Sequence, residues 1–238
     1  WLLGDDDRMV RSAVGKMLQI LSTASYDLVL VNGGRKTGEK ALGRVREKLP
    51  SVYTDQNKLL IDLGWHSTWI SCLIFGKKMI KEADFEKYFN TNFLQFSVIF
   101  NYLEGKQFRV YWQPEAMIYG LRRDLPAWIS SMFEVFGVRW MKAINALPDS
   151  YSLSAKAACI RSHGVKSGLF SARKLLFFRL VGYYNLGLFN QYKNILPSLI
   201  GYPLWLAYII AAFPIPKVVS RILREGLEEY LKRRKRIV

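Results

Sequence analysis

The first seven residues constrain this chain more than any other stretch. An apolar start, Trp-Leu-Leu-Gly, is followed at once by three consecutive aspartates, Asp5, Asp6 and Asp7. Beyond them, apolar residues recur with helical spacing and predict a helix over 9–22. This order predicts a buried strand over 1–3 that delivers acids to the carboxyl end of a sheet, where α/β proteins place their ligand sites. The alternative is an acidic helix start, because aspartate caps helices and favours the positive end of the helix dipole.

Three adjacent carboxylates repel one another, so they ionise together most easily when a cation neutralises them. Oxygen ligands suit hard ions, which take the rest of their coordination shell from waters and substrate phosphates. The acidic run therefore predicts a Mg²⁺ or Mn²⁺ site. The sequence contains no Cys-x-x-Cys, no His-Glu-x-x-His and no P-loop pattern, so it gives no support for zinc or Walker-type chemistry.

The chain is strongly basic, with a formal net charge of +16, yet half of its residues are hydrophobic, unlike a disordered tail. The charge is uneven, because residues 150–224 contain ten lysines and arginines and no acid. A segment that combines cations with many aromatic residues predicts a polyanionic partner, either an anionic membrane surface or nucleic acid. The two cysteines, Cys72 and Cys159, lie in apolar surroundings and indicate a reducing compartment.

Strands and helices alternate over the first 124 residues. The predicted elements are a strand over 26–31 ended by Asn32-Gly33-Gly34, a polar surface excursion over 35–48, a strand over 69–75, a helix over 92–103 with one apolar face, and a strand over 108–112 closed by Pro114. This alternation predicts the α/β fold class for a layered domain over 1–124.

Beyond residue 124 the chain changes character, and a basic helical region is predicted over 125–195. The stretch 196–216 is apolar and uncharged but contains four prolines. A re-entrant or interfacial membrane segment therefore fits it better than a spanning helix, with a buried core helix as the alternative. Residues 218–238 predict a basic amphipathic helix at a membrane surface, or else a solvated helix with a frayed basic end.

The acidic run, the helix after it and the strand ending at Asn32 together resemble the second half of a family 2 glycosyltransferase domain. The resemblance continues through 69–75 and the helix from Asn92 to the strand ending in Trp-Gln-Pro-Glu at 112–115, with an Arg-Arg pair shortly after. It covers 1–124 and is closest to the abequosyltransferase-like branch, bacterial enzymes of O-antigen and capsule assembly. It implies the C-terminal half of a GT-A (Rossmann-like) domain, and we expect a truncation that removes the N-terminal donor-binding strands.

The resemblance implies a nucleotide-diphosphate sugar donor and a divalent metal that neutralises the charge growing on the leaving diphosphate. The aspartate run matches the metal-binding DXD motif of the family. Asp5 and Asp7 are the first choice for the metal pair, with Asp6 nearby, and Asp5 and Asp6 are the expected donor contacts. The usual spelling of the family would place its first aspartate at Gly4, so the choice of pair stays open.

Inverting members of the family use a general base, usually an acid at the start of the helix that corresponds to 92–103. No acid stands there in this chain. The candidates are His66, whose intrinsic pKa suits a base, and three acids upstream of the helix, Glu82, Asp84 and Glu86. A structural hydrogen-bonding role is the alternative for His66.

Acceptor contacts are predicted at Trp65, His66, Gln95, Arg122 and Arg123. An aromatic ring can stack on a sugar, and the arginine pair can bind an acceptor pyrophosphate through paired hydrogen bonds. The alternatives are core packing for the tryptophan and a solvated turn, pairing with Asp124, for the arginines.

We therefore expect a hexosyl- or deoxyhexosyltransferase that moves a sugar from a nucleotide-diphosphate donor to a lipid-linked glycan acceptor in cell-surface polysaccharide biosynthesis. It would lie on the cytoplasmic face of the bacterial inner membrane, peripheral or monotopic, without a nucleic-acid partner. Two alternatives stay open. One is a non-catalytic basic protein that binds membrane or nucleic acid, and the other is a degenerate transferase that acts as an assembly partner. A metal-dependent phosphohydrolase is less favoured, because no second acidic or histidine cluster offers ligands for a second metal.

Overall fold

The computed structural model describes residues 1–37, 40–121 and 127–235, with the backbone alone at 37, 40, 127 and 231–235. The chain forms two compact units. Unit 1 comprises Trp1–Leu121 and Ala143–Cys159, and unit 2 comprises Arg122–Lys142 and Ile160–Val238. The three regions predicted from the sequence, 1–124, 125–195 and 196–238, differ from this grouping, because part of the second region belongs to unit 1 and no division falls near residue 195.

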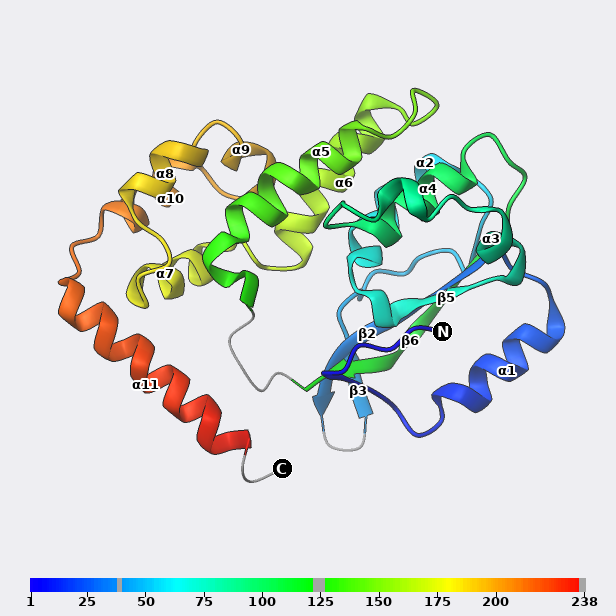
Figure 1. Ribbon diagram of the computed structural model, residues 1–238, viewed down its shortest axis with the longest axis horizontal. Coiled ribbons are helices and arrows are strands. Elements are labelled where there is room, and N and C mark those ends of the chain that lie inside the picture. Colours follow the sequence, from blue (N-terminus) through cyan, green and yellow to red (C-terminus); the bar gives the residue numbers. More distant parts are fainter. Residues whose placement is uncertain (38–39, 122–126, 236–238) are drawn as a thin grey trace. The chain divides into compact units, whose positions relative to one another are not determined.

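Unit 1 is a mixed α/β structure, so the α/β fold class predicted from the sequence is confirmed (Figure 1). Its strands are β1 (Asp7–Met9), β2 (Leu28–Thr37), β3 (Lys40–Gly43), β4 (Val52–Tyr53), β5 (Leu73–Phe75) and β6 (Val110–Gly120). Its helices are α1 (Ala13–Thr23), α2 (Gln56–Leu63), α3 (Lys77–Glu82) and α4 (Leu94–Leu103), with short 3₁₀ turns η1 (Gly64–Thr68), η2 (Ile70–Cys72) and η3 (Glu86–Tyr88).

Two long parallel strands, β2 and β6, form the centre of the six-stranded sheet in the described part of the chain. The other four strands pair with them in antiparallel fashion: β3 and β5 with β2, and β1 and β4 with β6. The first halves of β2 and β6 lie in the core. The second half of β2 pairs with β3, and the second half of β6 pairs with β1. The sheet therefore brings Asp7 of β1 to the second half of β6.

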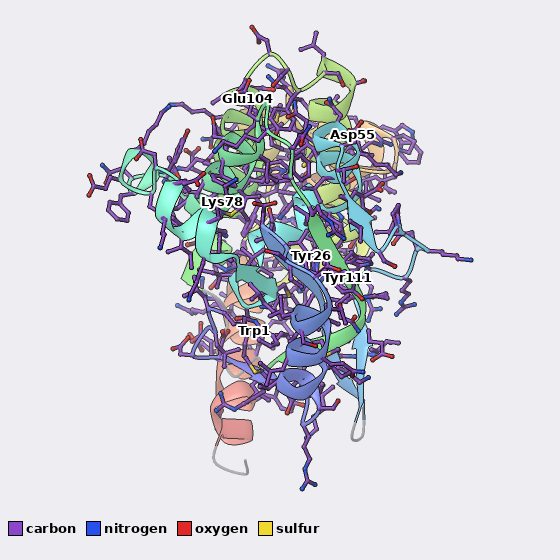
Figure 2. All side chains as sticks on the ribbon, turned by 90° about the vertical axis from the view of Figure 1, so that its right-hand side faces the viewer. Trp1, Tyr26, Asp55, Lys78, Glu104 and Tyr111 are labelled. Carbon is purple, nitrogen blue, oxygen red and sulfur yellow. The ribbon has the colours of Figure 1, made fainter. Side chains whose placement is uncertain are left out.

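Both faces of the sheet are buried, because successive side chains of β2 point to opposite faces. Val29 and Val31 pack with Met17 of α1, while Leu28 and Leu30 are equally buried on the other face. Figure 1 shows α1 on one side of the sheet and α2 and α4 on the other. On the α1 side, the partly buried rings of Trp1, Tyr26 and Tyr111 complete the packing (Figure 2), with the two tyrosine ring centroids 5.2 Å apart.

The predicted helix over 92–103 is confirmed as α4, and all five residues of its predicted apolar face are buried: Phe93, Phe96, Ile99, Phe100 and Leu103. The strand predicted over 69–75 is shorter in the structure, where η2 occupies its first part and only β5 is extended.

The predicted strand over 1–3 is wrong. Residues 1–4 have no regular secondary structure, and the strand begins at Asp7 and pairs with β6. Leu2 and Leu3 are about half exposed, so the apolar run does not enter the core. The helix after it begins at Ala13 instead of residue 9, because Met9 still belongs to β1. Only Ala13 and Met17 of this helix are buried, and the predicted apolar positions Val14, Leu18 and Leu21 are exposed.

The predicted ends of the two central strands are also wrong. β2 continues through Asn32-Gly33-Gly34, and β6 continues through Pro114. The reason is the side chain of Asn32, which is buried and donates to the carbonyls of Val45 and Pro114 at 2.7 and 2.9 Å while accepting from the Val45 amide. These bonds replace ladder bonds where β6 bulges. The surface excursion predicted over 35–48 instead contains the end of β2 and β3.

Unit 2 is helical in its described part. Its elements are the 3₁₀ turn η4 (Ala127–Ser131), the π-helix η5 (Glu134–Arg139), α7 (Ala172–Leu180), α8 (Leu186–Tyr192), α9 (Leu196–Leu199), α10 (Leu204–Ala212) and α11 (Lys217–Lys235). Helices α5 (Trp140–Asn145) and α6 (Leu153–Lys166) contribute residues to both units. The helical character predicted beyond residue 125 is confirmed. The apolar stretch 196–216 is divided into two helices at its prolines.

Helices α10 and α11 expose apolar residues in stripes. Ala207, Ile210 and Ala211 form the buried face of α10. Three large residues of its other face are exposed, and so is Phe213 just after the helix: Trp205, Tyr208 and Ile209. Figure 1 shows α11 leaving the other helices of unit 2 after its first turns. Within the described residues, no single helix is long and apolar enough to cross a membrane. Helices α10 and α11 qualify only as a pair, and the chain bends by 99° between them.

Candidate functional site

The aspartates lie on a tight turn at the edge of the sheet. The amide of Asp7 donates to the carbonyl of Gly4 at 3.2 Å, and the Leu121 amide donates to the carbonyl of Asp6 at 2.7 Å. In the ladder between β1 and β6, Asp7 is opposite Gly120. The turn is thereby fixed by backbone bonds to the second half of β6.

Asp7 is buried, whereas Asp5 and Asp6 are exposed. The Oδ2 atom of Asp7 accepts two hydrogen bonds of 2.6 Å, one from the indole nitrogen of Trp69 and one from the hydroxyl of Ser71. Two donors on one oxygen orient the carboxyl group. Asp7 is therefore held in a single orientation.

Ser71 connects this carboxylate to the start of the chain. Its hydroxyl oxygen also accepts a hydrogen bond of 2.8 Å from the amide of Gly4, and its carbonyl accepts one of the same length from the indole of Trp1. The 3₁₀ conformation of η2 turns the Ser71 side chain toward the aspartates. The residues before β1 thus have a defined position although they form no strand.

Gly4 packs closely against two of the three carboxylates. A Cβ atom at Gly4 would lie 3.2 Å from Oδ2 of Asp7 and 3.4 Å from Oδ1 of Asp6. A Cβ at Gly120 would lie 3.4 Å from the other oxygen of Asp7. The two glycines therefore keep the surroundings of the Asp7 carboxylate clear. This geometry favours Asp6 and Asp7 as a metal-binding pair over the first choice made from the sequence, Asp5 and Asp7.

An exposed arginine stacks on the tryptophan that donates to Asp7. The guanidinium of Arg44 lies 4.8 Å from the ring centroid of Trp69, the same ring that donates to Asp7. The Trp69 ring packs so closely on Gly33 that a Cβ there would lie 2.5 Å from it. Burial raises the pKa of the neighbouring Cys72 thiol; the positive charge of Arg44 opposes that shift and the charge of Asp7 adds to it.

The described residues supply only part of the coordination shell of a hard divalent ion. Oδ2 of Asp7 already accepts two hydrogen bonds, so Oδ1 of Asp7 and the carboxylate of Asp6 are the oxygens that can serve as ligands. Such an ion takes its remaining ligands from water and phosphate oxygens. Among the described residues, no group of three or more acidic, histidine or cysteine side chains converges to form a complete protein cage. This donor set resembles a site completed by a phosphate ligand more than a site closed by protein.

His66 lies in the core of unit 1, with 1% of its surface exposed. Its Nε2 is 2.9 Å from the carbonyl of Val31, so this nitrogen carries the proton and donates. The ring packs edge-on against Trp65 and Trp112, with centroids 5.5 Å away in both cases. Burial lowers the pKa of His66 to about 4; the bond to Val31 opposes the shift and the charge of Arg44 adds to it. The geometry matches the structural role that the sequence left as an alternative.

The acids proposed as bases lie on the surface. Glu82, Asp84 and Glu86 are all exposed. Glu82 lies 3.8 Å from the ammonium of Lys106, and Asp84 accepts a hydrogen bond of 3.0 Å from the Lys87 amide. The first turn of α4 carries no acid. The catalytic base stays a prediction without an assigned residue.

Of the predicted acceptor residues, the structure describes three, which lie in η1 and at the start of α4: Trp65, His66 and Gln95. Trp65 is fully buried, and Gln95 donates to the carbonyl of Thr68 at 3.1 Å, which ties the start of α4 to η1. Arg122 and Arg123 lie outside the described residues. Sequence reasoning did not connect four residues with the aspartates: Trp69, Ser71, Arg44 and Gly120. Their sequence distance from the aspartates leaves no local signal for them.

In comparisons with known proteins, no family model, no curated protein and no solved structure matches this chain.

Proposed function

We propose that this protein is a metal-dependent glycosyltransferase of the GT-A type that moves a sugar from a nucleotide-diphosphate donor to a lipid-linked glycan. The mixed sheet with helices on both faces is compatible with that fold type. The observation that carries the proposal is the arrangement of Asp6 and Asp7, whose carboxylates both lie next to Gly4. Asp7 is oriented there by Trp69 and Ser71.

In this proposal, the residues of the turn hold the donor diphosphate through a Mg²⁺ or Mn²⁺ ion. Asp7 supplies a fixed oxygen ligand, and the exposed Asp6 supplies a second. The bound ion would neutralise the charge that grows on the leaving diphosphate. Arg44, exposed and stacked on Trp69, offers a positive charge for a phosphate oxygen on the same side.

The test is Mn²⁺ binding by the 238-residue chain, measured by electron paramagnetic resonance with and without UDP. Asp7→Asn keeps an oxygen that can accept from Trp69 and Ser71 but removes the charge. We expect this variant and Asp6→Asn each to weaken Mn²⁺ binding in the presence of UDP by at least about tenfold. Asp149→Asn, at an exposed acid of unit 1, is the matched control. Equal affinity in all four proteins would overturn the proposal.

A degenerate transferase that serves as an assembly partner is the second candidate, and the acid-free first turn of α4 favours it. The two candidates differ in turnover. An active enzyme incubated with Mn²⁺ and a panel of nucleotide sugars would release nucleoside diphosphate faster than Asp7→Asn does. Binding of Mn²⁺ and UDP without any such release would favour the assembly partner.

We propose further that unit 2 attaches the protein to an anionic membrane surface at the cytoplasmic face. The exposed stripe of α10 supports this, because Trp205 and Tyr208 have the amphipathic rings that favour a membrane interface. Four residues of α11 add a second exposed stripe: Val219, Ile222, Leu223 and Tyr230. The acid-free composition of 150–224 gives the charge complementarity.

Flotation with vesicles of phosphatidylcholine and phosphatidylglycerol tests the attachment. Trp205→Ser with Ile209→Ser should reduce vesicle binding by about tenfold, since two large apolar side chains no longer enter the interface. The control pair is Ile80→Ser with Leu153→Ser, two exposed apolar residues of unit 1. Equal binding by both double variants would contradict the attachment through α10.

A further inference from the structure

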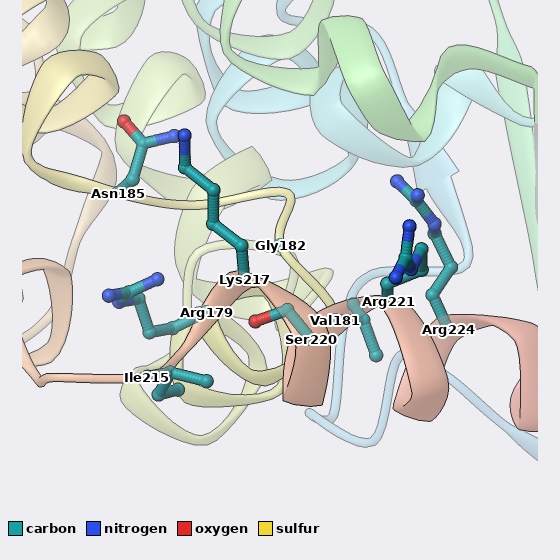
Figure 3. A pocket seen from close by; sticks show the side chains of 9 residues that line it. All are labelled: Arg179, Val181, Gly182, Asn185, Ile215, Lys217, Ser220, Arg221 and Arg224. Atoms are coloured by element: carbon teal, nitrogen blue, oxygen red, sulfur yellow. The ribbon is translucent and has the colours of Figure 1, made fainter.

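Unit 2 contains an open pocket of about 460 Å³ whose lining is strongly cationic (Figure 3). It lies between the C-terminal end of α7 with the loop that follows and the first turns of α11. Among its nine described lining residues there is no acid, and four are cations: Arg179, Lys217, Arg221 and Arg224. A cavity with this lining is a candidate site for an anion.

One face of α11 supplies most of the pocket. Lys217, Ser220, Arg221 and Arg224 follow the spacing i, i+3, i+4 and i+7, which places them on one side of a helix. The exposed apolar stripe of α11 lies on a different side, at Val219 and the positions three and four residues beyond it. The cations therefore belong to a face distinct from the proposed membrane contact of this helix.

Two of the four cations are fixed by the protein itself. Arg179 donates from Nε and Nη2 to the carbonyl of Phe213, at 3.0 and 2.6 Å. The guanidinium of Arg224 lies 5.9 Å from the ring centroid of Tyr183. Both arginine side chains are half-buried. Their positions are set before a ligand arrives, and neither contact neutralises their charge.

The other two cations face the solvent at the mouth of the pocket. Lys217 and Arg221 are exposed, and within the described residues neither takes part in an ion pair. Figure 3 shows the Lys217 side chain extending toward Asn185. Long cationic side chains at a pocket mouth can close on an anion at little cost in backbone movement.

Neutral donors and close packing complete the pocket. Ser220 is the buried residue of the α11 face, and its Cβ lies 3.6 Å from where a Cβ on Gly182 would stand. Gly182 has φ +84°, a conformation that favours glycine, and it allows the loop to approach α11. Asn185 uses its Oδ1 to accept from the Leu188 amide, which directs its amide nitrogen away from α8. The pocket is thus built from several elements that constrain one another.

The charge balance of the pocket indicates what it binds. Four like charges around one cavity repel one another, and an anion that binds only the folded state relieves this repulsion and stabilises that state. The volume is within the usual range of small-molecule sites, about 300–1,000 Å³, so the ligand can be larger than a single phosphate. We propose that this pocket binds a phosphorylated ligand carrying at least two negative charges.

Such a phosphate group can belong to a soluble diphosphate compound or to the head group of a lipid. The inference uses only residues of unit 2 and does not rest on the proposed transferase activity. Its failure would leave the Mn²⁺ result at Asp6 and Asp7 unaffected, and the converse also holds.

The experiment compares two double variants of the whole chain by calorimetry with inorganic pyrophosphate at low salt. Lys217→Gln with Arg221→Gln removes the two exposed pocket cations. Arg173→Gln with Lys193→Gln removes two exposed cations of unit 2 that do not line the pocket, so the net charge change is the same. Circular dichroism checks that both variants fold. We expect the pocket variant to weaken pyrophosphate binding by at least about tenfold and the control by less than about twofold.

A second binding experiment uses vesicles of phosphatidylcholine with phosphatidic acid. It distinguishes a soluble phosphate ligand from a lipid head group. Loss of pyrophosphate binding with unchanged vesicle binding would support a soluble phosphate ligand. Loss of vesicle binding in the pocket variant, together with competition by pyrophosphate in the wild type, would support a lipid head group. The proposal is overturned if neither probe depends on the pocket cations more than on Arg173 and Lys193.

Discussion

The aspartate turn of unit 1 and the cationic pocket of unit 2 collect charge in opposite ways. At the turn, Asp7 is buried and held by neutral donors of two distant residues. In the pocket, two cations are exposed, and the arginines that are fixed make contacts that leave their charge intact. Burial makes the first region depend on hydrogen bonds, whereas solvent access makes the second depend on salt and bound anions. Each region can therefore be perturbed by a condition that leaves the other nearly unchanged.

The largest expected effect is on the free energy of unfolding, through a substitution in the aspartate turn. Asp7→Ala removes two hydrogen bonds and leaves the partly buried Trp69 indole and the buried Ser71 hydroxyl without their acceptor. We expect a loss of roughly 4 kcal/mol in the free energy of unfolding, measured by urea denaturation. Asp5→Ala, on the same turn but exposed, should change stability by less than about 0.5 kcal/mol. Similar losses in the two variants would show that burial does not distinguish these acids.

The next largest expected effect is on the pH dependence of folding stability, through His66 in unit 1. In an unfolded chain a histidine takes up its proton near pH 6.5, whereas burial lowers the pKa of His66 in the folded protein to about 4. The unfolded state thus binds more protons between these values, so stability is full above pH 6.5 and falls as the pH drops toward 4. The expected loss from this residue is about 3 kcal/mol.

His66→Gln tests this origin, because glutamine can still donate to the Val31 carbonyl but does not titrate. Urea denaturation between pH 4 and 8 should give a flatter pH dependence for this variant than for the wild type, whatever its stability at pH 8. Parallel curves would mean that His66 is not the group responsible.

The smallest expected effect is on the melting temperature, through the cationic pocket of unit 2. Lys217→Gln with Arg221→Gln should raise the melting temperature by about 1–2 °C at low salt, because repulsion within the pocket decreases. The gain should disappear in 0.5 M NaCl, where screening already weakens that repulsion. A gain that persists at high salt would point to a helix-propensity effect in α11 instead. Differential scanning calorimetry of both proteins at two salt concentrations makes this measurement.

The parts of the fold that sequence predicted well are those in which local periodicity coincides with burial. The helix α4 was found with its buried face, because its apolar residues recur at helical spacing and the core covers all of them. The helix α1 has similar periodicity, yet Val14, Leu18 and Leu21 are exposed. Periodicity identifies a helix, but it does not show whether another element covers the apolar face.

The ends of β2 and β6 were predicted wrongly because the side chain of Asn32 makes hydrogen bonds that a sequence pattern cannot indicate. Asn-Gly-Gly is typical of a turn, yet here the amide of Asn32 satisfies backbone groups of Val45 and Pro114, and the strand continues. At the candidate site, the acidic run itself was identified from the sequence. Its partners Trp69 and Ser71 were not, since they stand 62 and 64 residues away from Asp7 and become neighbours only through the fold.

The bulge in β6 has a consequence for how this chain tolerates insertions and deletions. Between Val31 and Gly33, two steps along β2, the paired residue on β6 advances from Gln113 to Ile118. Adding or removing one residue in that interval would turn every later side chain of β6 to the opposite face and move Gly120 away from Asp7. A one-residue insertion or deletion in this interval is therefore expected to separate Gly120 from Asp7 and to disrupt the site.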